Sequence, residues 1–227
     1  AGSGASGLAE GSLGVAAFDT PQGLAVDPVT GDIVVAESAR NVVRRITTAG
    51  RVNTWVGDGV PASADGLLLA ARLDSPAFVA VDAAGDAFLC DTGNFRVRRI
   101  TAGGAVTTVA GSTSGHSDDA LGANALFFDP DGVAEVAGEL FIGDSGNHVV
   151  RKVGIASTVS TYAGQPTLPG FTDGVGSHAL FGSARDLALT ASGAVFVGDE
   201  LRAAIRKIGT DAQHTVTTVA GAGANLG

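Results

Sequence analysis

The residues able to carry chemistry in this chain are 4 histidines, 1 cysteine and 23 aspartates and glutamates among 227 residues. A closed metal site needs three or four converging ligands. Of the histidines, His116, His148, His178 and His214, only His116 and His178 lie in comparable segments. The chain also has no Gly-x-Ser-x-Gly elbow, no phosphate-cradling loop and no Cys/His nucleophile pair. We therefore predict no catalytic residue and no metal ligand.

One acid recurs with an arginine seven residues after it at four places in the chain. If the turn between them is centred between positions 40 and 41, acid and arginine lie directly opposite each other at the rim of a small sheet. The carboxylate then forms a charge-assisted pair and also accepts N–H groups of the turn. Four identical copies favour a structural role over a cation-binding ring of acids. The pairs are Glu37 and Arg44, Asp91 and Arg98, Asp144 and Arg151, and Asp199 and Arg206.

The spacing of other residues shows that the chain consists of four copies of one repeat. A large apolar residue opens each copy, at intervals of 55, 54 and 54 residues, and an acid stands eight residues before it. These connector acids are predicted to form turns rather than to bind a ligand. The opening residues are Phe18, Leu73, Phe127 and Phe181, and the acids are Glu10, Asp65, Asp119 and Asp173.

Each repeat is predicted to form four short strands. In the first copy they span 23–27, 32–37, 41–46 and 52–56, are rich in Val and Ile, and are bounded by Gly, Asp and Asn. Four short strands per repeat without long helices predict an all-β propeller whose blades stack on their neighbours. The predicted single domain consists of a Gly-rich connector (1–17) and four blades with their connectors (18–72, 73–126, 127–180 and 181–227).

The third repeat resembles the NHL repeat, which is named for Asn-His-Leu. Here the motif reads Asn147-His148-Val149 after Asp144, and the second repeat matches through Asp91-Thr-Gly-Asn94. The first and fourth repeats depart at this turn. The resemblance implies a β-propeller of a family that commonly has six blades and includes binding scaffolds, RNA readers, lyases and lactonases. We therefore favour a larger, six-bladed ring completed by unseen chain or a neighbouring subunit over closure of four blades.

Propeller topology predicts that the connectors and second-to-third turns open on one face. The first-to-second and third-to-fourth turns then open on the other face. Because the connectors differ most between repeats, we expect binding on their face. The predicted binding residues are His116, Asp118, Asp119, Gln165, Pro166 and Asp173.

Charge and composition narrow the function classes. With 14 Lys and Arg against 23 Asp and Glu, the net charge of −9 argues against nucleic acid as a partner. No apolar run is long enough for membrane insertion. We predict a non-catalytic scaffold that binds a protein or itself without a cofactor, and the absence of an initiator Met favours an exported, extracellular chain. The alternative is a calcium-dependent hydrolase or lyase with carboxylates in its channel. Candidate carboxylates, which also fit turn capping, are Asp27, Asp82 and Glu135.

Overall fold

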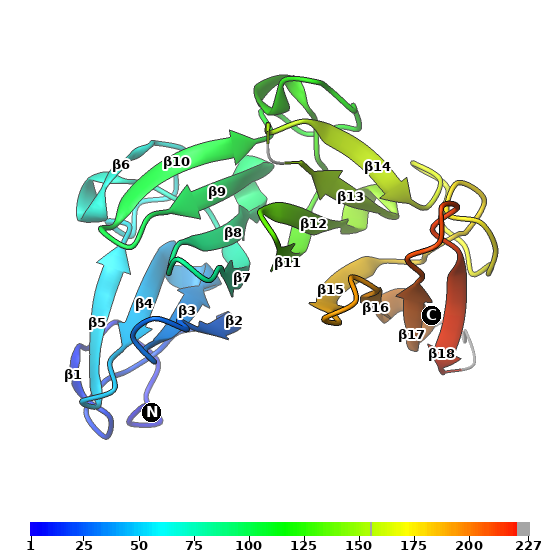
Figure 1. Cartoon of the computed structure of the whole chain (residues 1–227). Coiled ribbons are helices and arrows are strands. Elements are labelled where there is room, and N and C mark those ends of the chain that lie inside the picture. The colour runs from blue at the N-terminus through cyan, green and yellow to red at the C-terminus, as the bar shows by residue number, and fades with distance from the viewer. Residues whose placement is uncertain (155, 222–227) are drawn as a thin grey trace. The chain divides into compact units, whose positions relative to one another are not determined.

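Four antiparallel sheets follow one another along the chain. A computed structural model describes residues 1–154 and 156–221, and these residues contain strands and short 3₁₀ turns but no α-helix. Each sheet contains a four-stranded meander, and the first two sheets carry a short fifth strand at one edge (Figure 1). The prediction of an all-β chain built from four four-stranded blades is therefore confirmed. The last six residues of the predicted fourth segment, 222–227, lie outside the described residues.

The strands agree with the predicted spans of the first repeat to within two residues. Blade 1 contains β2 (Pro21–Val26), β3 (Ile33–Glu37), β4 (Val42–Ile46) and β5 (Arg51–Val56). Blade 2 contains β7 (Pro76–Val81), β8 (Ala87–Asp91), β9 (Arg96–Ile100) and β10 (Ala105–Ala110). Blade 3 contains β11 (Pro130–Val136), β12 (Glu139–Asp144), β13 (Val149–Val153) and β14 (Val159–Ala163). Blade 4 contains β15 (Ala184–Leu189), β16 (Val195–Asp199), β17 (Ala204–Ile208) and β18 (Val216–Ala220).

The connectors run back along the outer strands. In blades 1 and 2 they form two-residue edge strands, β1 (Gly11–Ser12) on β5 and β6 (Gly66–Leu67) on β10. In blades 3 and 4 single bridges, Asp119 to Val159 and Gly174 to Val216, do the same. A connector therefore reaches the start of the outer strand, beside the third-to-fourth turn. Short 3₁₀ turns also occur in two connectors, at Leu68–Ala70 and Gly122–Asn124.

The chain forms two compact units, residues 1–109 and the part from Ala110 onward. In the first unit, Val43 and Trp55 of blade 1 share a core with Leu73 and Val79 of blade 2. Burial of such apolar surface is the main force that holds one blade on the next. The second unit has its own core, formed by Phe141, Val150, Phe181, Leu187 and Val197 together with other buried apolar residues.

Glycines let the inner strands of adjacent blades approach each other. A Cβ atom on Gly23 of β2 would lie 2.5 Å from the Cα atom of Phe78 on β7. One on Gly132 of β11 would lie 2.1 Å from the carbonyl oxygen of Arg185 on β15. Any side chain at these two positions would push the blades apart.

The turn between the second and third strand of each blade corrects the predicted register. Ser38–Arg40 forms a 3₁₀ turn, and Asn41 follows with a φ of 56° in the left-handed region. This turn places Glu37 opposite Val42 and Arg44 opposite Val35. The prediction that acid and arginine lie directly opposite each other is therefore wrong. The turn is centred one residue earlier than expected, between positions 39 and 40, so the two residues are diagonal neighbours. The equivalent turns are Thr92–Asn94, Ser145–Asn147 and Glu200–Arg202.

No helix among the described residues is long and apolar enough to cross a bilayer.

Candidate functional site

The four acid–arginine pairs, which the sequence placed at the rim of each sheet, are buried. Both side chains of every pair are fully buried. Connectors cover them from outside, which the strand pattern alone did not indicate. The N–O distances are 3.0 Å for Glu37 and Arg44, 2.6 Å for Asp91 and Arg98, 2.9 Å for Asp144 and Arg151, and 3.3 Å for Asp199 and Arg206.

In blade 3 the hydrogen bonds of the pair tie the connector to the sheet. Arg151 donates to Asp144, to Asp118 at 2.7 Å, and to the carbonyl oxygens of Leu126 and Ser117 at 3.0 and 2.8 Å. All these acceptors belong to the protein itself. The guanidinium therefore joins the second strand, the blade opening and the preceding connector.

The carboxylate of Asp144 accepts hydrogen bonds from three groups. It accepts hydrogen bonds from the Phe128 N–H at 2.8 Å and from the Asn147 side chain at 2.9 Å, besides Arg151. The turn that follows receives no cap from this side chain, so the expectation that the acid accepts N–H groups of the turn is wrong. Burial raises the pKa of Asp144 to about 6, although the charge of Arg151 acts to lower it.

The connector acids form a second, more exposed layer. Asp65 and Asp173 each accept a hydrogen bond from the buried arginine of their blade, and also from the N–H and hydroxyl of a threonine on the outer strand. In blade 3 this acid is Asp118, which bonds Arg151 and Thr161. The repeat spacing pointed instead to Asp119, which accepts from the Leu121 N–H. Asp118, the structural equivalent of Asp65 and Asp173, lies nine residues before Phe127 and not eight. The spacing argument therefore chose the neighbouring residue.

The acids at the ends of the inner strands accept hydrogen bonds from N–H groups of the turns that follow. Asp27 accepts from the Val29 and Thr30 N–H groups. The other two acids make the same kind of local contact: Asp82 accepts from the N–H groups of Ala84 and Asp86, and Glu135 from that of Gly138. Within residues 1–154 and 156–221, no group of three or more His, Cys, Asp or Glu side chains is placed to hold a metal ion.

An open pocket of about 680 Å³ lies in the second unit. It brings together four of the six predicted binding residues: His116, Asp118, Gln165 and Pro166. The other two, Asp119 and Asp173, do not line it. Its remaining walls come from β14, from the connector that follows it, and from the turn between β17 and β18. The sequence did not point to the residues of β14 or of this turn. These remaining walls comprise Thr161, Tyr162, Ala163, Gly164, Val175, Ser177, Ala212, Gln213 and His214.

An aromatic stack forms one wall of this pocket. The Tyr162 ring lies on the His214 imidazole, with centroids 4.0 Å apart and planes 29° apart. The edge of Phe141 meets Tyr162 at 4.9 Å between centroids and fixes its ring. A ring held from two sides is a preorganised apolar surface. The only sequence signal for Tyr162 was its place in the outer strand, which does not distinguish it from a core residue.

His116 contributes a neutral polar side chain to the pocket. Its Nε2 atom lies 3.1 Å from the Thr161 hydroxyl. Burial, and then the charge of Arg151, lower the pKa of His116 below its ordinary value. The imidazole is therefore neutral near pH 7 and offers one donor and one acceptor.

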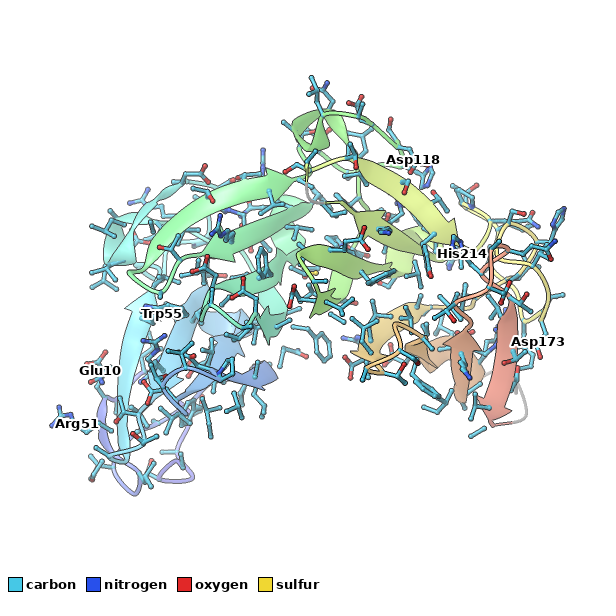
Figure 2. The ribbon with its side chains drawn as sticks, in the orientation of Figure 1. Glu10, Arg51, Trp55, Asp118, Asp173 and His214 are labelled. Atoms are coloured by element: carbon cyan, nitrogen blue, oxygen red, sulfur yellow. The ribbon has the colours of Figure 1, made fainter. Side chains whose placement is uncertain are left out.

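The pocket also corrects the predicted sorting of the loops. His116 lies in a connector and His214 in a third-to-fourth turn, and Figure 2 shows His214 at the turn before β18. The sequence placed such segments on opposite faces. They meet at β14, where His116 contacts the Thr161 hydroxyl and His214 stacks on Tyr162. The next connector holds the turn that carries His214, because the Gly176 N–H donates to the Gln213 carbonyl at 2.9 Å.

The other two histidines do not join the pocket. The Nδ1 atom of His148 lies 2.7 Å from the carbonyl oxygen of Gly182 and links blade 3 to blade 4. His178 contacts the adjacent Ser177 hydroxyl at 3.2 Å.

Solved structures that resemble this chain are β-propeller proteins. A streptogramin B lyase matches 92% of this chain with a TM-score of 0.62 and 13% identity, and the match covers 57% of the lyase. An auxiliary nutrient binding protein from Bacteroides thetaiotaomicron matches 82%, with a TM-score of 0.67, 18% identity and 47% coverage of that protein. A protein described as a putative gluconolactonase matches 94% of this chain with a TM-score of 0.62 and 14% identity, and the match covers 65% of that protein.

These likenesses establish the propeller fold and no activity. The chain spans about half to two thirds of the length of these propellers. They include a lyase, a protein described as a lactonase and a nutrient-binding protein, so one architecture serves both catalysis and binding. No family model matches the chain, and no curated protein matches it.

Proposed function

We propose that this chain is an NHL-type propeller that acts as a non-catalytic binding module and recognises a segment of a partner protein in the pocket of the second unit. The observation that carries the proposal is the meeting of His116, Asp118, Gln165 and Pro166 in one open pocket. These residues come from two connectors, the segments that vary between repeats. Variable loops on a rigid scaffold are where binding specificity usually lies.

The chemistry of the walls supports a peptide-like ligand. The stacked Tyr162 and His214 rings offer apolar surface, while Gln165 adds an amide able to donate and accept. A wall that combines aromatic rings with polar side chains suits an extended segment that brings one large side chain and its backbone amides. Among the solved propellers, the nutrient-binding protein gives a precedent for binding by this fold.

The arrangement of the acids favours binding over catalysis. The repeated acids make hydrogen bonds to arginines, threonines and backbone N–H groups, as the Asp65 and Asp173 contacts illustrate. A carboxylate held in this way supports the blade. General acid or base catalysis would instead require a group aimed at a substrate position.

Selection of peptides on the purified chain tests the proposal. Peptides enriched from a random display library should bind the wild type and lose about tenfold in affinity, or about 1.4 kcal/mol, with Gln165→Ala or His214→Ala. His178→Ala is the matched control, because His178 lies in the same unit outside the pocket. Equal binding by all variants, or no enriched peptide, would contradict the proposal.

Elemental analysis of the same preparation tests the enzymatic alternative. We expect substoichiometric calcium and zinc. One equivalent of either metal that survives dialysis would overturn the non-catalytic interpretation.

A further inference from the structure

The pocket of the second unit carries an acid in its wall without a matching base. Of the described residues that line it, Asp118 is the one aspartate or glutamate, and none is a lysine or arginine. The Asp118 side chain is 46% exposed, so its carboxylate is within reach of a ligand. It accepts one hydrogen bond from Arg151 and two from the N–H and hydroxyl of Thr161. A carboxylate has about four lone-pair positions, which leaves room for a further donor from outside.

The buried arginine behind the pocket does not cancel the charge of this acid. The guanidinium of Arg151 bonds two carboxylates, that of Asp144 at 2.9 Å and that of Asp118 at 2.7 Å. Burial raises the pKa of Asp144 to about 6, so this group is mostly ionised at pH 7. One positive charge therefore faces two negative charges. Because Arg151 and Asp144 are fully buried, Asp118 presents the excess negative charge to the pocket.

Further carboxylates surround the aromatic stack. Burial, and then the charges of Asp211 and Glu139, raise the pKa of Tyr162, because both carboxylates act on its ring. Asp211 is exposed and lies in the same turn as His214, whose N–H bonds the Asp211 carbonyl oxygen. Lys152 pairs with Glu139 at 2.7 Å. From residue 110 onward the chain has 6 Lys and Arg against 12 Asp and Glu. A hollow surrounded by charge of one sign favours a ligand of the other sign.

The uncharged walls suit a long side chain that ends in a flat cation. The Tyr162 and His214 rings form a stack, and a planar guanidinium packs well on such an aromatic surface. Pro166 and Val175 offer apolar contact to the aliphatic stem of the side chain. The amide oxygen of Gln165 is an acceptor for the N–H groups that the carboxylate does not take.

On the basis of the proposed function, we propose that the partner segment inserts an arginine into this pocket, where its guanidinium pairs with Asp118 and packs on the aromatic stack. Arginine suits the site better than lysine, because its planar fork donates to a carboxylate and an amide oxygen together, whereas an ammonium is compact and strongly hydrated. The same negative charges disfavour an acidic or phosphorylated segment.

Peptides selected on the purified chain from a random display library test this inference at pH 7. We expect the enriched peptides to share an arginine at one position. Replacing that arginine by citrulline, its neutral analogue of the same shape, should weaken binding to the wild type about tenfold, because a charged partner is lost from a hydrogen-bonded pair. With Asp118→Asn the same replacement should cost about threefold or less, because the two charges no longer act on each other.

Asp173→Asn is the matched control. Asp173 makes the equivalent contacts in blade 4, to Arg206 and to the N–H and hydroxyl of Thr218, but does not line the pocket. The two variants should therefore lose similar stability in urea, while Asp173→Asn binds the arginine peptide as the wild type does. The comparison of arginine and citrulline peptides on the wild type does not depend on the folding of any variant.

The outcomes separate this inference from the proposed function. Enriched peptides that depend on Gln165 or His214 but share no arginine would overturn the inference and leave the pocket as a peptide-binding site. If no peptide is enriched, both proposals fail. A citrulline replacement that costs as much on Asp118→Asn as on the wild type would refute the pairing of the arginine with Asp118.

Discussion

Replacing Arg151 by Met should be among the most destabilising single changes in the second unit. The substitution leaves the buried Asp144 without its charge partner and the carbonyl oxygens of Leu126 and Ser117 without their donor. Removing one member of a buried pair costs about 3–5 kcal/mol. At about 2–4 °C per kcal/mol for a chain of this size, the melting temperature should fall by about 10 °C.

The pH dependence gives this prediction a signature that ordinary loss of packing would not produce. Burial raises the pKa of Asp144 to about 6 in the folded wild type, above its ordinary 3.8, so this group's contribution to stability falls as the pH rises from about 4 to 6. Without Arg151 the folded pKa rises further, and stability continues to fall above pH 6. The difference between wild type and variant should therefore grow above pH 6, by up to about 1.4 kcal/mol per pH unit.

Urea unfolding followed by far-UV circular dichroism at pH 5, 6, 7 and 8 measures both effects. Lys152→Met is the matched control. This lysine is the next residue on the same strand, is 30% exposed and pairs with Glu139 at 2.7 Å, so its loss should cost about 1 kcal/mol or less. A cost for Arg151→Met no larger than that of the control, or one that does not change with pH, would refute the structural role assigned to the pair.

Two further predictions concern a strand end and a connector acid. Gly164→Ala should cost at least about 2 kcal/mol, because its φ is +101° and a Cβ atom would lie 2.7 Å from the His148 carbonyl oxygen; Gly198→Ala, where the nearest contact is 3.7 Å, should be near neutral in the same urea assay. Burial acts to raise the pKa of Asp173, but hydrogen bonds, first that from the Thr218 N–H, outweigh it and leave the pKa below the ordinary 3.8. The stabilisation that ionised Asp173 contributes is therefore present above pH 4 and lost as the pH falls through the folded pKa. Asp173→Asn should flatten the acid limb of a plot of unfolding midpoint against pH. An unchanged acid limb would exclude a stabilising role for the Asp173 carboxylate.

The repeat pattern was sufficient to predict the strands and their grouping into blades. Short runs of Val and Ile between Gly, Asp and Asn form strands because β-branched side chains suit the pleated surface and the flanking residues suit turns. Spacing also selected Glu37 and Arg44 as partners, because both the expected register and the observed one place these two side chains on the same face of the sheet, directly opposite in the first case and diagonal in the second. The polar pairs and the strands are thus local consequences of the sequence.

The details of the candidate site depended on long-range packing. Register required the left-handed residue Asn41, burial of the acid–arginine pairs required the connectors, and the choice of Asp118 over Asp119 required the path of one connector. The pocket formed where this connector and the turn carrying His214, about a hundred residues away in sequence, both contact β14. A repeat pattern predicts only what the units have in common. The pocket forms where connectors differ between units and fold back on the sheet. Only the tertiary structure brings such segments together.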